Sequence, residues 1–231
     1  MRLLLLIGCG LAFAGCQFPK DPEGTLNQVR ERGSIKVGVT HHDPFVNLHG
    51  PEPAGVEVEL IEGFADHLGV EVEWVEGSES QLVELLAGTE IDVMLAGLDR
   101  QSPLQKEVGF TRPYANVEIV VAVPPGEEEP NIEGLDVLVE ENSEAASITE
   151  KETDADPIRV PSLENADGRP VVVEDYLLDE LGYEKTGHSL KETEHCLAVP
   201  RGENAWLVEL ERYLLDQEAV ASDLLREEGT L

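Results

Sequence analysis

Basic residues are scarce in this sequence. Its 231 residues include 16 Lys plus Arg against 48 Asp plus Glu, which gives a formal net charge of -32. Clusters of basic side chains bind the phosphates of nucleic acids and of anionic membrane surfaces, so we expect neither as a partner. The acids are spread along the whole chain, as in an acidic soluble surface or in one adapted to a saline medium.

Long apolar runs are also rare. The one at the start covers residues 3–14 after Met1-Arg2. It is too short to span a membrane and is typical of a signal peptide. Phe13-Ala14-Gly15-Cys16 then resembles a bacterial lipobox, and Leu6-Ile7-Gly8-Cys9 is a competing match. We predict a signal peptide over 1–16, a lipid on Cys16 that anchors the protein to a membrane in the periplasm or at the cell surface, and a tether over 17–24. A plain secreted protein is the alternative.

The chain has only three cysteines. Cys9 lies within the predicted signal and Cys16 is the predicted lipidation site, so Cys196 has no partner for a disulfide. Cys196 lies in the strand-like run His-Cys-Leu-Ala-Val. A buried structural thiol is therefore expected there, with a catalytic thiol as the alternative.

Motifs of common catalytic sites are missing. The sequence has no Ser-His-Asp order, no nucleophile elbow and no Gly-rich phosphate loop. We therefore predict that the chain is not an enzyme and that it holds no cofactor.

One loop is rich in histidine, with His41, His42, Asp43 and His49. Imidazole is a good ligand for Zn²⁺ and Ni²⁺. Adjacent His side chains point apart in an extended chain, however, and no helical pair four residues apart supports them. We expect a solvated loop and no metal site.

The sequence does contain an alternation of strand and helix patterns. Strand, helix, strand order implies a parallel sheet in an α/β fold. The predicted strands cover 35–39, 70–74, 91–96, 117–123, 135–139, 170–173 and 196–199. The predicted helices cover 26–32, 60–68, 80–86, 143–151, 206–214 and 219–225. Thr25 and Ser80 are the expected N-caps of the first and third helices, and residues 152–168 carry no clear pattern.

Ile91 to Tyr114 is the most informative stretch. An apolar run over 91–96 ends at Gly97 and leads into a polar turn over 99–103. Ligands of open α/β sheets gather at the carboxyl ends of strands, so a site is expected here. Ala96-Gly97 and the segment Val-Gly-Phe-Thr-Arg-Pro-Tyr over 108–114 resemble the signature of family 3 extracellular solute-binding proteins, the receptors of amino-acid-type ABC importers.

This resemblance extends over nearly all of the mature chain, including residues 26–39 and Gly-Val-Glu-Val-Glu-Leu over 55–60. It implies a two-lobed, periplasmic-binding-protein-like (type II) α/β architecture, in which each lobe is a mixed sheet flanked by helices. The first lobe is expected over 25–119, a short second lobe over 120–193, and a return to the first lobe over 194–231.

The resemblance also implies where a ligand would be held. In the family an Arg forks onto the ligand carboxylate, but its position here is Leu104, and Arg100 is the nearby substitute. Phe45 matches an aromatic residue that covers the ligand, and Asp99 falls where a hydroxyl commonly contacts it. Asp175 falls on the Asp that binds the ligand ammonium.

The loop of the second lobe contributes Glu140 and Ser143 to the predicted site. It runs Glu-Glu-Asn-Ser-Glu over 140–144, where the family often has a Lys or a Gly-rich turn. Carboxylates there repel an anion, although Glu144 is also a good solvent-facing residue for a first helical turn. A pocket with acids and an aromatic wall suits an amine or a quaternary ammonium ion, with an amino acid held through Arg100 as the competitor.

Together these patterns predict a lipid-anchored receptor that closes two lobes on a small solute and then docks to an ABC permease. A sensory or regulatory binding module without a transporter is the main alternative, since such lobe pairs also occur fused to histidine kinases and lytic transglycosylases. An orphan lobe pair that acts by protein contact is the third. A few members of this fold are dehydratases, but nothing in the sequence indicates that chemistry.

Overall fold

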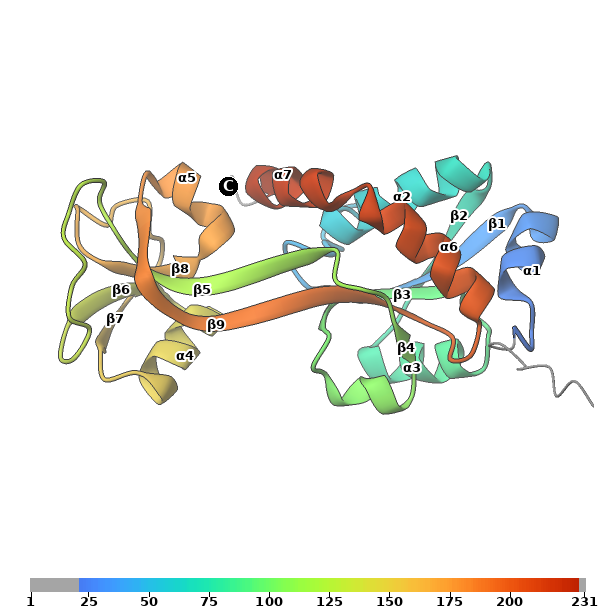
Figure 1. Cartoon of the computed structure of the whole chain (residues 1–231), viewed down its shortest axis with the longest axis horizontal. Helices are drawn as coiled ribbons and strands as arrows, with labels where there is room; N and C mark the ends of the chain where they lie inside the picture. Colours follow the sequence, from blue (N-terminus) through green and yellow to red (C-terminus); the bar gives the residue numbers. More distant parts are fainter. Residues whose placement is uncertain (1–20, 229–231) are drawn as a thin grey trace, which may run out of the picture.

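One mixed sheet of nine strands runs through the protein in a computed structural model that describes residues 21–228. Its order is β2-β1-β3-β9-β5-β8-β6-β7, with β4 added beside β9. Figure 1 shows two bodies joined by the long strands β5 and β9. The strands are β1 (Ser34–Val39), β2 (Glu71–Glu76), β3 (Val93–Asp99), β4 (Gly109–Phe110), β5 (Ala115–Val123), β6 (Asp136–Glu140), β7 (Asp156–Val160), β8 (Val171–Glu174) and β9 (Glu184–Val199).

Helices flank the sheet in both bodies, which confirms the predicted α/β class. We use "first body" for β1 to β4 with α1 to α3, α6 and α7, and "second body" for β6 to β8 with α4, η2 and α5. The helices are α1 (Thr25–Arg32), α2 (Val56–Leu68), α3 (Glu79–Ala87), η1 (Pro103–Lys106), α4 (Glu144–Glu152), η2 (Asp175–Leu177), α5 (Leu178–Leu181), α6 (Asn204–Leu215) and α7 (Glu218–Glu228).

Local signals explain most helix ends. Gly33 and Gly69 end α1 and α2 in the left-handed conformation that glycine adopts without steric cost. Both predicted N-caps are wrong by one or two residues. Gly24, not Thr25, caps α1, and Ser78, not Ser80, caps α3 in a capping box with Gln81. In the capping box the side chains of Ser78 and Gln81 each accept a hydrogen bond from a backbone N–H group of the other residue. The helix is therefore capped by Ser78 and not by Ser80, which would offer one such bond.

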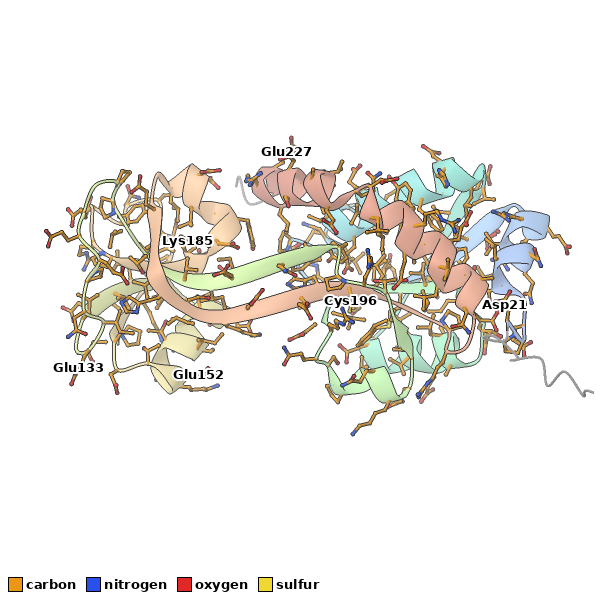
Figure 2. All side chains as sticks on the ribbon, viewed as in Figure 1. Asp21, Glu133, Glu152, Lys185, Cys196 and Glu227 are labelled. Atoms are coloured by element: carbon orange, nitrogen blue, oxygen red, sulfur yellow. The ribbon has the colours of Figure 1, made fainter. Side chains whose placement is uncertain are left out.

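The hydrophobic core is divided between the two bodies. Two clusters of buried residues draw on 29–117 and 196–225, and two others lie within 119–173. Figure 2 labels Cys196, which lies on the end of β9 that packs against the first body and is fully buried. Burial raises the pKa of its thiol to about 12, as expected for a structural cysteine.

Four strands differ from the sequence prediction, and one of them, β4, lies where the sequence predicts no strand. β3 does not end at Gly97 but runs on to Asp99, because the positive φ of Gly97 fits an irregularity in the pairing of β3 with β9. β9 begins twelve residues earlier than the predicted strand at 196, and β7 lies in the stretch without a pattern. Pairing with β5 and β6 supplies both segments with hydrogen-bond partners that no local pattern reveals.

The predicted lobe boundaries at 119/120 and 193/194 fall inside β5 and β9. We keep them as a proposal for how the two bodies divide. Within 21–228, no helix combines the length and the apolar character needed to cross a membrane. The predicted signal peptide and Cys16 lie outside the described residues.

Candidate functional site

A cavity of about 290 Å³ lies between the two bodies, and we name it the Phe45 cavity. The first body supplies the loop before α2, the second body supplies the start of α4 and the end of β8, and β5 and β9 form the floor. It is lined by His42, Asp43, Pro44, Phe45, Val117, Ile119, Ser143, Glu144, Glu174, Tyr176, Thr193 and His195.

A second cavity of about 290 Å³ adjoins it, since both are lined by Asp43, Pro44 and Tyr176. We name it the Glu140 cavity, and the two together the cleft. The remaining lining residues are Asn47, Glu140, Ser162, Leu163, Glu164, Leu177, Glu180 and Leu181. The cleft therefore has room for a small molecule with walls from both bodies.

The cleft is strongly acidic. Among the described residues that line it, six are Asp or Glu and none is Lys or Arg. Glu174 shows the consequence most clearly, because burial, together with the neighbouring acids Glu144 and Glu140, raises the pKa of its carboxyl. Lys191 pairs with Glu144 at 2.7 Å, but within 21–228 no salt bridge reaches Glu174.

Aromatic rings form one wall of the Phe45 cavity. Phe45 stacks on His195 with ring centroids 4.0 Å apart, and His42 meets the edge of Phe45 at 5.8 Å. His195 Nδ1 lies 3.2 Å from the carbonyl oxygen of Gly97, so Nδ1 carries the proton and Nε2 is left as an acceptor. Burial lowers the pKa of His195 to about 4, which keeps this ring neutral near pH 7.

Beneath that wall lies a fully buried carboxyl group. Glu57 accepts hydrogen bonds from the Gly97 N–H at 3.1 Å and from the Tyr114 hydroxyl at 2.8 Å. Burial raises the pKa of Glu57 to about 7 even though both hydrogen bonds favour the charged form. This cluster fixes Gly97, and with it the backbone against which His42 and Phe45 pack.

The structure places three of the predicted site residues in the cleft. Phe45 and Ser143 line the Phe45 cavity, and Glu140 lines the cavity named after it. Ser143 caps α4, since its hydroxyl accepts a hydrogen bond from the Ala146 N–H at 3.0 Å. The loop and the helix start thus meet at the Phe45 cavity and the end of β6 lies at the adjoining one, and their role in holding a ligand stays a prediction.

The other three predicted residues lie elsewhere. Asp99 accepts from the Gln101 N–H at 2.7 Å, and Arg100 lines a different cavity beside Arg112 and Glu194. Asp175 accepts from the Glu118 N–H at 3.0 Å and faces a third cavity. Arg100 is therefore not among the groups that line the cleft.

The sequence analysis missed several cleft residues, among them Glu174, Tyr176, Thr193 and His195. Glu174 and Tyr176 are the neighbours of Asp175 in the sequence. The sequence analysis selected this segment but named Asp175, whereas the side chains of Glu174 and Tyr176 line the Phe45 cavity. Thr193 and His195 belong to the part of β9 that was not predicted, and only its pairing with β5 and β3 places them there.

The family is settled by a direct comparison. The model of the bacterial extracellular solute-binding proteins, family 3, matches residues 35–221. The chain belongs to this family. The predicted resemblance and the type II periplasmic-binding-protein architecture are thereby confirmed, and members of the family are extracellular proteins that bind small solutes.

Solved structures agree on the fold. An ancestral cationic amino acid solute-binding protein has a TM-score of 0.68 at 18% identity, over 88% of this chain and 98% of the other. The L-cystine solute receptor of Neisseria gonorrhoeae, in an unliganded open conformation, has a TM-score of 0.67 at 17% identity, over 89% and 98%.

Two curated relatives match parts of the chain. Membrane-bound lytic murein transglycosylase F of Vibrio cholerae is 31% identical over 153 residues, which cover 63% of this chain and 29% of the relative. A probable histidine-binding protein of Campylobacter jejuni is 28% identical over 115 residues, which cover 49% and 45%. The chain thus spans less than half the length of these relatives.

The prediction that the chain is not an enzyme is wrong, because it excluded an activity that relatives in sequence and in fold possess. The transglycosylase of Vibrio cholerae is among its relatives, and an ancestral cyclohexadienyl dehydratase shares the fold with a TM-score of 0.64 at 18% identity, over 89% of this chain and 96% of the other. Family and fold therefore do not exclude catalysis, because a cleft that surrounds a small molecule with carboxyl groups also offers acids and bases.

Proposed function

We propose that the chain captures a small cationic solute, an amine or a cationic amino acid, in the cleft between its two bodies. The observation that carries this is Glu174, a carboxyl group that faces the Phe45 cavity among other acids, with no Lys or Arg in the described lining. A positively charged group that enters the cavity relieves the repulsion among these acids.

The rest of the cavity supports the same ligand class. The faces of Phe45 and Tyr176 offer cation–π contacts, and the neutral ring of His195 offers an acceptor. The starts of α4 at Ser143 and of η2 at Glu174 supply backbone donors near the lining, and each stands beside a carboxylate, Glu144 in the first case and Glu174 itself in the second. This favours a ligand whose charge is mainly positive over one held by its carboxylate.

A thermal-shift screen of the purified protein tests the proposal, with polyamines, quaternary amines, and cationic and neutral amino acids as ligands. A ligand that binds only the folded state raises the unfolding midpoint. We expect Glu174→Gln to weaken binding of the stabilising cation about tenfold or more, because a hydrogen bond to a charged group is worth about 1.5–3 kcal/mol. The matched control is Glu59→Gln, which removes one carboxylate from the exposed face of α2, outside the cleft lining, and leaves the affinity unchanged.

Two results would overturn the proposal. One is a cation that stabilises wild type and Glu174→Gln equally. The other is stabilisation by neutral amino acids only, lost in Arg100→Ala, which would restore the family's usual recognition of the carboxylate.

We further propose that the protein is held to a membrane through Cys16 and delivers its solute to an ABC importer. Membership in family 3 supports the transport role. Mass spectrometry of the mature N-terminus tests the lipid, and uptake of labelled solute by cells with and without the gene tests transport. Loss of uptake in the deletion strain is the expected result.

A regulatory binding module is the second candidate. It is favoured by the relatives named as lytic murein transglycosylases, of which this chain resembles less than a third. In that case deletion of the gene leaves solute uptake intact and changes cell-wall turnover, measured by the release of murein fragments.

A further inference from the structure

Three side chains of the His-rich loop converge at the rim of the cleft. One ligand atom from each of His41, Asp43 and His49 lies within 4.8 Å of the others. His41 Nε2 and Asp43 Oδ2 are 3.5 Å apart, and the rings of His41 and His49 have centroids 4.4 Å apart. Asp43 also lines both cavities, so the cluster borders the cleft.

The spacing suits a metal ion. Two ligands of a tetrahedral ion with bonds of about 2.0–2.2 Å lie about 3.3–3.6 Å from each other. The His41–Asp43 pair already has this separation. The remaining ligand atoms lie within 4.8 Å of one another, so they must approach by at most about 1.5 Å, which small rotations of exposed side chains can supply.

The loop backbone holds these residues in place without an ion. The His42 N–H donates to the Val46 carbonyl at 2.8 Å, and the Asn47 N–H donates to the Ala54 carbonyl at 2.7 Å. Phe45 and Val46 are buried in the core of the first body. A site on a loop anchored in this way loses little conformational freedom on binding.

The alternation of side chains separates the histidines at the start of this loop. His41 and Asp43 lie two residues apart and share one side of the chain, whereas His42 lies on the other side and packs against Gly97 and Phe45. The adjacent residues His41 and His42 do point apart. The loop then turns so that His49 lies near His41 and Asp43, where it offers the third ligand atom.

We propose that His41, Asp43 and His49 bind a divalent transition-metal ion such as Zn²⁺, with water completing the coordination shell. Two imidazoles and one carboxylate favour Zn²⁺, Ni²⁺ or Co²⁺ over Mg²⁺ and Ca²⁺, which prefer oxygen ligands. Binding through Nε2 of His41 moves its ring proton to Nδ1 and gives up the long hydrogen bond from the Leu48 N–H, 3.4 Å. The ion brings positive charge to the rim of an acidic cleft.

Isothermal titration of the untagged full chain with Zn²⁺ tests the site, in excess Mg²⁺ so that scattered surface carboxylates are occupied. We expect one equivalent of Zn²⁺ to bind, and the double variant His41→Gln/His49→Gln to bind at least about tenfold more weakly. The matched control is His67→Gln, which removes an exposed histidine of α2 and leaves the affinity unchanged.

A second readout does not depend on affinity. Co²⁺ bound by two imidazoles and a carboxylate in tetrahedral geometry absorbs strongly in the visible range, and the double variant loses this absorption while its circular dichroism stays that of the folded protein. The proposal is overturned if Zn²⁺ binding is abolished by Mg²⁺, if it is equal in wild type and the double variant, or if Co²⁺ gives only the weak spectrum of octahedral oxygen ligation.

Discussion

Glu57 and His195 hold the same residue from opposite sides. The Gly97 N–H donates to the Glu57 carboxylate at 3.1 Å, and the Gly97 carbonyl lies 3.2 Å from Nδ1 of His195. Both side chains are buried, at 0% and 6% exposure. Burial disfavours their charged forms, so it raises the pKa of Glu57 to about 7 and lowers the pKa of His195 to about 4.

These two shifts make opposite contributions to the pH dependence of stability. Folded Glu57 binds its proton more tightly than unfolded Glu57, so its contribution is complete below pH 4.5 and is lost as the pH rises to about 7. His195 binds its proton less tightly when folded, so its contribution is complete above pH 6.5 and is lost as the pH falls to about 4. Between pH 4.5 and 6.5 the two contributions offset each other.

Single variants should separate the two contributions. Between pH 4 and 7 we expect the free energy of unfolding of Glu57→Gln to rise by about 3 kcal/mol relative to that of wild type. In this variant the contribution of His195 remains and the opposing contribution of Glu57 is absent. His195→Gln should make the free energy of unfolding fall by a similar amount over the same range. Urea unfolding at a series of pH values measures both slopes.

The matched control for the pH series is Glu59→Gln, which removes one negative charge from the exposed face of the same helix. Its slope should stay close to that of wild type. Parallel slopes for Glu57→Gln and His195→Gln would show that neither group titrates with the folding equilibrium.

Gly97→Ala should disturb the wall of the Phe45 cavity. Gly97 has φ +58°, and a Cβ there would lie 2.8 Å from His42 Cδ2 and 2.9 Å from Phe45 Cδ2. The left-handed backbone costs about 1–2 kcal/mol for a residue with a side chain. Displacement of the two rings adds about 1–3 kcal/mol. We expect a loss of unfolding free energy of about 2–5 kcal/mol together with weaker solute binding.

Gly69→Ala is the control for the backbone part of this effect. Gly69 has φ +70°, but a Cβ there meets no atom within 4 Å. The Gly69→Ala variant should therefore lose only the free energy that a left-handed backbone costs a residue with a side chain, and it should bind solute as the wild type does. Equal losses in both variants would mean that the rings of His42 and Phe45 adjust without cost.

Glu203→Ala should loosen the start of α1. The Glu203 side chain is 2% exposed and accepts hydrogen bonds from the backbone N–H groups of Glu23 and Thr25, at 3.0 and 2.9 Å, and from the Thr25 hydroxyl at 3.0 Å. It caps a helix that lies about 180 residues earlier in the chain. Loss of these bonds should cost about 1–3 kcal/mol in urea unfolding.

A control for Glu203→Ala is Glu84→Ala, which removes an exposed carboxylate from α3. It should change the unfolding free energy by less than about 0.5 kcal/mol. If the two variants are equally stable, the capping contacts of Glu203 contribute nothing to the folded state.

Salt should stabilise the protein. With 48 acids against 16 bases, repulsion within the folded chain is screened as the Debye length falls from about 30 Å at 0.01 M to about 3 Å at 1 M salt. We expect the melting temperature to rise with KCl over this range, by about 2–4 °C for each 1 kcal/mol gained. An equal rise in a non-electrolyte of the same osmolality, or no rise in KCl, would argue against charge repulsion.

Much of the fold could be predicted because its signals are local. Residues 56–68 repeat apolar side chains at helical spacing and end at Gly69, so α2 follows from one short segment. The first part of β9 had no such signal, because its residues are largely polar and partly exposed and are held by pairing with β5. A strand that depends on its partner leaves little trace in its own sequence.

The candidate site, too, could be predicted only in part from the sequence. The sequence alone determined the acidic character of the chain, most of the strand and helix order, the resemblance to the family, and that Phe45, Glu140 and Ser143 are candidates for ligand contact. Only the tertiary structure decided that Glu174 rather than Asp175 faces the Phe45 cavity, that Glu57 and His195 meet at Gly97, and that His41 and His49 converge. The reason is that composition and periodicity are properties of single segments, whereas the direction of a side chain depends on where each strand ends and what packs against it.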